Sequence, residues 1–520
     1  MPSRYSAPTG RRASRQDTAT RRSVIIRSAT GRRVIAALGA LTMLFTGSAF
    51  SGSTQAARPA AAPFANVQVS HDSYPAHSEP DIVENPANPD NLVAGSKMFT
   101  DPAHYRFQIG TYYSMNGGRT WHDTGFLPGF DSFDLTSDIS FAFSPNGSLV
   151  YACVLADTYD NQRSGIFVSR SRDGGKTWSQ PVAVYLDTTG NTFSDKAWIA
   201  VDTSHSPNRG TVYVAWNLDP QSSGGNGDPG SGRLRARAHI APRNPADYPI
   251  GIVVARSTDY GKTFSAPVVV RKFGTQSQNF ALSAYPAVAP NGNLYVAYIT
   301  WDSARVNGKS TTVHRLDVAE SRDGGQTFTV RTAVSHVDAL PDKLPNSTFR
   351  NFSMPVLGIS PVDGAMVLVW PDMRNGDADI LAVHSTNGGK TWSAPIRVNH
   401  DPVHDGKDQF QPAIAVAPNG TFTCAWFDRR FDPGNRLIDE EIAQSTDDGK
   451  SFGVNVRVTK SSWDPAIGAP KAPGGVTFIG DYQGVAADNT TVHPLWNDTQ
   501  NGTSQQIRST AVAVTILARR

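Results

Sequence analysis

Apolar and polar residues alternate in many short segments of this chain, with the period of two that is typical of β-strands. Residues 138–155, 284–301 and 411–430 each contain two such runs of Val, Ile, Ala and Tyr, separated by Pro-Asn-Gly. A tight turn between alternating runs predicts a pair of antiparallel strands. Two more short runs follow, as at 250–257 and 265–272. Four strands per unit are typical of one blade of a β-propeller.

An eight-residue segment recurs between the third and fourth runs. It reads SRDGGKTW from Ser171, and neither a phosphate-binding loop nor a calcium loop fits it, because no helix follows and Asp173 is its only carboxylate. An Asp or Asn at the third position accepts hydrogen bonds from the following amides, and Gly at the fifth permits a positive φ. The segment therefore predicts a self-contained turn. Its other copies begin at Ser114, Ser257, Ser321, Ser385 and Ser445.

The chain contains seven repeat units, one more than the six copies of the eight-residue segment. They begin near residues 79, 137, 196, 284, 354, 411 and 481, and the last has only three strands before the chain ends. Residues 65–72 resemble the fourth strands of other units, so an N-terminal strand would complete the last blade. We predict an all-β fold, a single propeller of four-stranded blades over residues 64–518. Seven blades are favoured, with six as the alternative.

The first 56 residues have the features of an export signal. Arginines precede an apolar run at 34–50, and small residues follow it. A membrane anchor is the alternative, but the run is near the lower limit of about 20 residues for a spanning helix. Removing residues 1–56 takes away nine arginines and one acid, which changes the formal charge from +3 to −5. We therefore expect a secreted protein without a membrane span and without a nucleic-acid partner.

The two cysteines, Cys153 and Cys424, fall in different repeats at neighbouring rather than equivalent strand positions. Their side chains should therefore face opposite ways. We expect two buried thiols rather than a disulfide.

The pattern S-x-D-x-G-x-T-[WF] resembles the Asp-box, or BNR, repeat of bacterial sialidases. The segments WFDRR at 426–430 and FIGDYQG at 478–484 are similar to those of exported bacterial sialidase-like proteins. The resemblance implies that the turns lie on the face away from the active site. It also implies three arginines that bind the substrate carboxylate, a Tyr nucleophile backed by a Glu, and an Asp as acid and base.

Several residues fit these roles on the expected face. Tyr482 is the candidate nucleophile, with Asp481 or Asp195 as the proton donor. The alternatives are that Asp-Arg pairs at strand ends only satisfy loops, and that Asp481 and Tyr482 only fill the channel. Glu79 is the fourth candidate catalytic residue. The candidate arginines of the anion clamp are Arg374, Arg429, Arg430 and Arg350, and further acids are Asp81, Asp372, Asp428, Glu440 and Glu441.

The leading hypothesis from the sequence is a monomeric, sialidase-like exo-glycoside hydrolase that acts on sialic acid or another acidic sugar at the mouth of the channel. It needs no cofactor, and nothing indicates a structural calcium ion. One alternative is a polysaccharide lyase, in which a Tyr or His base removes a proton from a uronic acid. The other is a non-catalytic propeller that binds a glycan or a protein at the same face.

Overall fold

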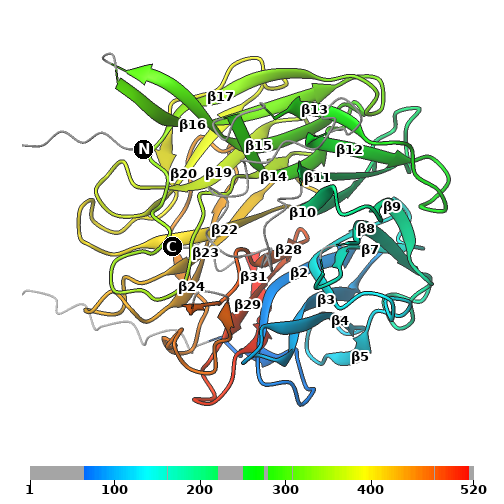
Figure 1. Ribbon diagram of the computed structural model, residues 1–520. Helices are drawn as coiled ribbons and strands as arrows, with labels where there is room; N and C mark the ends of the chain where they lie inside the picture. Colours follow the sequence, from blue (N-terminus) through cyan, green and yellow to red (C-terminus); the bar gives the residue numbers. More distant parts are fainter. Residues whose placement is uncertain are drawn as a thin grey trace, which may run out of the picture. The chain divides into compact units, whose positions relative to one another are not determined.

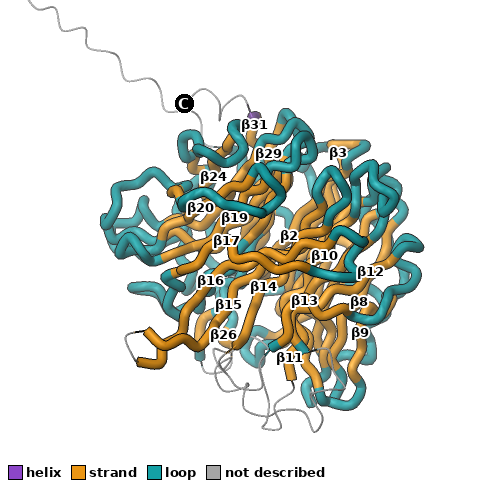
Figure 2. The backbone as a smooth tube through the Cα atoms, turned by 90° about the horizontal axis from the view of Figure 1, so that it is seen from above, coloured by secondary structure: helices purple, strands orange, loops and turns teal. Residues whose placement is uncertain are grey.

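A computed structural model describes residues 64–160, 162–220, 250–273, 279–306, 309–472 and 475–514. The leader predicted at residues 1–56 lies outside them. Apart from one helical residue after β31 (Val512–Ala513), the described chain consists of strands and loops (Figure 2). Its strands form seven four-stranded antiparallel units in chain order around a ring (Figure 1). The prediction of a seven-bladed all-β propeller is confirmed, and the six-bladed alternative is wrong.

The first six blades follow the chain strictly, each with its strands in the order first to fourth. They are β2 (His77–Asn85), β3 (Asn88–Asp101), β4 (Arg106–Ser114) and β5 (His122–Phe126); β6 (Leu135–Phe143), β7 (Val150–Asp157), β8 (Ser164–Ser171) and β9 (Val182–Asp187); β10 (Thr192–Val201), β11 (Val212–Pro220), β12 (Gly251–Ser257) and β13 (Val268–Lys272); β14 (Asn279–Val288), β15 (Leu294–Val306), β16 (Lys309–Ser321) and β17 (Thr329–Val337); β18 (Val356–Ile359), β19 (Met366–Asp372), β20 (Asp379–Ser385) and β21 (Ile396–Arg397); β22 (Gln409–Val416), β23 (Phe422–Asp428), β24 (Asp439–Ser445) and β25 (Val456–Arg457).

The seventh blade contains strands from both ends of the described chain. Its order is β28 (Gly484–Ala487), β29 (Thr491–Asp498), β30 (Gln506–Ser509) and then β1 (Val67–Gln68), which pairs with β30 in antiparallel register. A short strand, β31 (Val512–Ala513), pairs with β29. Blades one and seven are neighbours, since β2 lies against β28 and β29 (Figure 1).

The eight-residue segments are turns between third and fourth strands, as predicted. In SRDGGKTW, the Oγ of Ser171 accepts a hydrogen bond from the amide of Gly175 at 2.9 Å. The Asp173 carboxylate accepts from the Thr177 amide at 2.9 Å and from its hydroxyl at 2.6 Å. Gly175 has φ +90°, which a side chain would make unfavourable. In each of the first six blades, this turn lies at the end of the blade where the first strand ends.

The core lies between neighbouring sheets, where the apolar residues of each alternating run face one another. The second strands of three blades end in Trp-x-Asp, and in each the buried indole N–H donates to the Asp two residues later. The N–H of a buried Trp usually has such a partner. Cys153 and Cys424 are buried free thiols, so the prediction of no disulfide is confirmed. The tryptophan and aspartate pairs are Trp370 with Asp372, Trp426 with Asp428 and Trp496 with Asp498.

Five first strands carry a β-bulge at the same position, close to where each strand begins. The first bulged residue has a positive φ between +50° and +64°, although none of the five is glycine. Bulges re-aim side chains, and non-glycine residues hold this conformation only where the surrounding structure enforces it. The five are Glu79, Asp138, Lys196, Ser283 and Gln411, and the register places Met354 and Tyr482 at the matching positions of blades five and seven.

Candidate functional site in the central channel

A pocket with a volume of about 530 Å³, its open mouth included, lies among the first strands of six blades. These strands surround the axis of the ring (Figure 1). Aromatic, aliphatic and polar side chains share the lining. The lining residues used below are Asp81, Trp198, Ser283, Tyr285, Phe352, Met354, Gln411, Asp481 and Tyr482.

Aromatic rings form one wall of this pocket. The ring of Trp198 lies 5.1 Å from that of Tyr482 and 5.0 Å from that of Tyr285, measured between centroids. Phe352 and Met354 extend the apolar surface from the loop before β18. Such a wall suits the C–H face of a sugar ring, because apolar contact there leaves the hydroxyl groups free for a few polar partners.

A buried ion-pair network lies beside the pocket. Asp481 accepts hydrogen bonds from Arg350 at 2.8 and 2.6 Å and from the Lys196 ammonium at 2.7 Å. The same ammonium lies 3.4 Å from one oxygen of Glu79, and the other oxygen of Glu79 lies 2.6 Å from the Lys97 ammonium. All five side chains are at most 9% exposed.

The charges of this network balance. Asp138 lies 3.8 Å from the Lys196 ammonium and its carboxylate accepts from the Lys196 amide, so three carboxylates face three cations. Burial alone would raise the pKa of Asp138, but Lys196 and Lys97 hold it below its usual value. Burial alone would lower the pKa of Lys196, but Asp481 and Glu79 raise it well above its usual value. Complete pairing is what makes buried charges tolerable.

Two carboxyl groups of the pocket have pKa values shifted in opposite directions. Burial raises the pKa of Asp81 to about 7, although the Phe141 amide donates to its carboxylate at 2.8 Å. Burial would also raise the pKa of Asp481, but Arg350 and Lys196 hold it well below the usual range. At neutral pH the pocket thus contains a carboxyl group poised to give up a proton and a carboxylate that stays ionised. Such divergence is typical of acid and base pairs.

The structure brings three of the four predicted catalytic residues together, but in other roles. Tyr482 lines the pocket, yet burial and then Glu79 raise the pKa of its phenol well above 10, and its hydroxyl lies 3.5 Å from the carbonyl of Ile139. Arg350 and Lys196 favour the ionised form of Asp481, which does not suit its predicted role as the proton donor. Glu79 is held by two lysines.

Asp195, the fourth predicted catalytic residue, lies in the blade-three bulge but does not line the pocket among the described residues. Burial raises the pKa of its carboxyl well above the usual value, and one of its oxygens accepts a hydrogen bond from the Lys196 amide at 3.0 Å. This hydrogen bond supports the bulge.

The four predicted arginines do not converge on one point. Arg374 donates to Asp372 at 2.8 and 2.7 Å, and Arg430 donates to Asp428 at 2.9 and 2.6 Å. Both continue the Trp-x-Asp motif of their blades, as the alternative of local Asp-Arg pairs expected. Arg429 is fully buried and donates to two backbone carbonyls, those of Pro345 and Arg436. Arg350 alone reaches the channel, where it binds Asp481.

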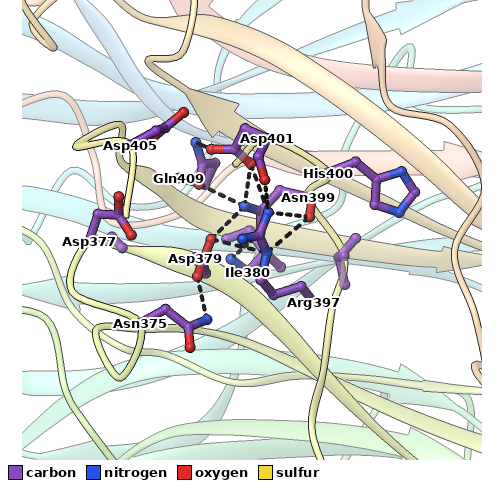
Figure 3. Close-up of polar contacts among 12 residues, drawn as sticks. Asn375, Asp377, Asp379, Ile380, Arg397, Asn399, His400, Asp401, Asp405 and Gln409 are labelled. Atoms are coloured by element: carbon purple, nitrogen blue, oxygen red, sulfur yellow. Dashed lines mark hydrogen bonds and ion pairs between the residues drawn. The ribbon is translucent and has the colours of Figure 1, made fainter. Parts of the chain in front are cut away.

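Other charges of the loops between blades five and six are also paired locally (Figure 3). Arg397 lies 3.5 Å from Asp379 and 3.4 Å from Asp401, and the Asn399 amide donates to both carboxylates at 2.6 Å. Gln409 donates to the other oxygen of Asp401 at 3.0 Å. This network joins the end of blade five to the start of blade six, which is a structural role.

Loop contacts explain how Arg350 reaches the channel. A hairpin of β26 (Lys471–Ala472) and β27 (Val476–Thr477) precedes blade seven, and Phe349 forms a parallel bridge to Thr477. The bridge places the residue after Phe349 beside Asp481, 131 positions further along the chain. A pairing over this distance has no signal in one sequence.

Lys97, Lys196 and Asp138 belong to the network but were not predicted from the sequence. Lys97 lies on a second strand, and nothing in its local pattern distinguishes it. Lys196 and Asp138 had a signal, because aligning the starts of the first strands places them at the same repeat position as Glu79 and Gln411. A polar residue recurring where an alternating strand should be apolar marks a channel-facing position.

In the described part of the chain, no group of three or more His, Cys, Asp or Glu side chains is arranged to hold a metal ion. Nor do the described residues include a helix with the length and hydropathy needed to cross a membrane.

No protein-family model and no curated protein matches the sequence. Solved structures share its chain path at low identity. An α-L-arabinanase from Penicillium chrysogenum, complexed with arabinobiose, is 10% identical with a TM-score of 0.46, over 88% of this chain and 99% of that one. An ulvan lyase is 12% identical with a TM-score of 0.46, over 87% and 95%. The NanB sialidase of Streptococcus pneumoniae is 12% identical with a TM-score of 0.41, over 88% and 72%. Likeness at this level says nothing about the substrate of this chain.

Proposed function

We propose that the protein is a glycan-active enzyme of the glycoside hydrolase type, with the channel pocket as its sugar site and Asp81 as its proton donor. The observation that carries the proposal is the pair of pocket carboxyl groups, Asp81 with its pKa raised to about 7 and Asp481 held ionised. Glycosidases need one carboxyl group to protonate the leaving oxygen and a second to act on the cationic transition state.

Each pocket residue has a role under this proposal. Asp81 protonates the glycosidic oxygen, since a pKa near the working pH is best for proton transfer. Asp481 faces the positive charge that develops on the sugar ring, and its pairs with Arg350 and Lys196 fix its position. The neutral Tyr482 and Trp198 form the apolar wall.

The geometry does not favour the exo-sialidase activity that the sequence suggested. It requires a common arginine clamp, and Arg374, Arg429 and Arg430 are bound elsewhere. The lyase alternative requires a basic side chain, and the described lining contains neither histidine nor a tyrosine with a lowered pKa. A non-catalytic glycan-binding propeller is an outcome of the test below.

The test has two assays at pH 4 to 9. One measures hydrolysis of a panel of 4-methylumbelliferyl glycosides, and the other measures the release of reducing ends from oligosaccharides. We expect kcat to fall as the pH rises through about 7, because Asp81 must be protonated. Asp81→Asn should lower kcat by at least ~100-fold. Asp195→Asn is the matched control, a buried carboxyl with a raised pKa outside the pocket, and should retain activity.

Absence of turnover on every substrate would exclude the proposal, and retained glycan binding without turnover would establish a binding module instead. An Asp81→Asn variant with an unchanged kcat and pH profile would remove Asp81 from the mechanism.

A further inference from the structure

We infer that the pocket accepts an uncharged sugar residue and rejects sialic and uronic acids. The inference deepens the proposed function and rests on it. Its first basis is the lining, whose described residues include the two carboxyl groups of Asp81 and Asp481 but no lysine, arginine or histidine. An anionic sugar would therefore leave water for a pocket whose ionised group has the same sign of charge.

The nearest cations are already bound. Arg350 uses its Nε and one terminal nitrogen on Asp481, and Lys196 is shared between Asp481 and Glu79. Lys97 forms an ion pair with Glu79, and its ammonium lies 4.3 Å from the Phe107 ring centroid. A substrate carboxylate could gain a cation only by displacing one of these carboxylates. That would break a buried ion pair and leave the displaced charge unpaired.

The uncharged polar groups of the lining suit hydroxyl groups instead. The side-chain NH₂ of Gln411 donates to the carbonyl of Gly480 at 2.8 Å, while its buried Oε1 has no hydrogen-bond partner among the described residues. Gln411 is 3% exposed, and this oxygen can only accept. A sugar hydroxyl placed beside it can donate to it, whereas a carboxylate in the same place can only accept. The protonated Asp81 offers a donor nearby.

The discrimination should be large. A like-charge contact in a desolvated interface is strongly unfavourable, and so is an unpaired buried charge. We expect neutral monosaccharides to bind the wild-type protein at least ~100-fold more tightly than N-acetylneuraminic, glucuronic or galacturonic acid.

The experiment measures binding and turnover separately. Isothermal titration calorimetry compares free neutral hexoses and pentoses with the three acidic sugars, and the 4-methylumbelliferyl glycosides of the same sugars test hydrolysis. Binding and hydrolysis of neutral sugars alone support both proposals. Binding of neutral sugars without hydrolysis supports the pocket assignment and removes the enzymatic one. Preferential binding or hydrolysis of an acidic sugar overturns the inference while leaving a glycan-active function in place.

A charge-gain variant gives a second, independent readout. Met354 lines the pocket, is 8% exposed and is close to lysine in length. Met354→Lys should create the missing cation and improve binding of the acidic sugars at least ~10-fold relative to Met354→Leu, the matched control without charge. No gain in a folded Met354→Lys protein, judged by its thermal transition, would show that the lack of a cation is not what excludes acidic sugars. If the variant does not fold, the wild-type comparison still decides.

Discussion

Asp81→Asn should make the protein more stable at neutral pH although it removes the proposed proton donor. Asp81 is 9% exposed, and its pKa is raised from a usual value near 4 to about 7 because burial penalises the carboxylate. The unfolded chain therefore releases this proton at a lower pH than the folded protein does. The stability that Asp81 contributes is present below pH 4 and is lost as the pH rises towards 7.

The magnitude follows from the difference between the two pKa values. A shift of about three pKa units costs the folded protein about 4 kcal/mol at pH 7 and about 0.5 kcal/mol at pH 4. Asparagine has the same shape, carries no charge, and its Oδ1 can still accept the hydrogen bond of the Phe141 amide. The gain in unfolding free energy from Asp81→Asn should thus grow by about 3 kcal/mol between pH 4 and pH 7.

The assay is denaturant unfolding of both proteins at pH 4, 5, 6 and 7, with the free energy difference taken at each pH so that other titrating groups cancel. Asp138→Asn is the control of opposite sign, since Lys196 and Lys97 lower the pKa of Asp138. It should destabilise the protein at pH 7 and approach the wild type as the pH falls below about 4. A stability gain for Asp81→Asn that is the same at every pH, or a loss at pH 7, would refute the reasoning.

Two further predictions concern the ion-pair network and the turns. Lys196→Met should destabilise the folded state by about 3–5 kcal/mol, because Asp481 and Glu79 both lose a buried cation. Denaturant unfolding at pH 7 measures this loss, and a value below about 1 kcal/mol would mean that Arg350 and Lys97 alone are enough to balance the two carboxylates. Asp173→Ala should lower the unfolding free energy by only about 1 kcal/mol, because it removes the hydrogen bonds to Thr177. It should leave glycoside turnover unchanged, because the turn lies at the end of its blade opposite the pocket, and altered turnover would contradict this.

The fold was predictable because the sequence repeats the same four-strand unit along the chain. Every unit carries its own alternation, three units carry a Pro-Asn-Gly turn and six carry the eight-residue turn, and all of these are short-range features. Ser171 and Gly175 meet within one turn, so the chemistry of a few neighbouring residues is enough to specify it. The same reasoning placed Cys153 and Cys424 correctly as separate buried thiols.

The candidate site was predictable only in part. Glu79, Asp481 and Tyr482 were recognised as channel residues, but their roles depend on neighbours that the sequence does not bring together. Asp481 resembles a proton donor until Arg350 and Lys196 are placed beside it, which lowers its pKa. Arg374 and Arg430 resemble an anion clamp until their bonds to the preceding aspartates are seen.

The sequence by itself determined the four-stranded blades and favoured seven of them, since these follow from local periodicity, while the face of the eight-residue turns was implied by the family resemblance. The tertiary structure decided the charges of the channel. Every first strand contributes one bulged or matching position, and residues from six blades line one pocket of low dielectric constant. There, the protonation of Asp81 depends on burial, and the ionisation of Asp481 depends on cations from distant repeats.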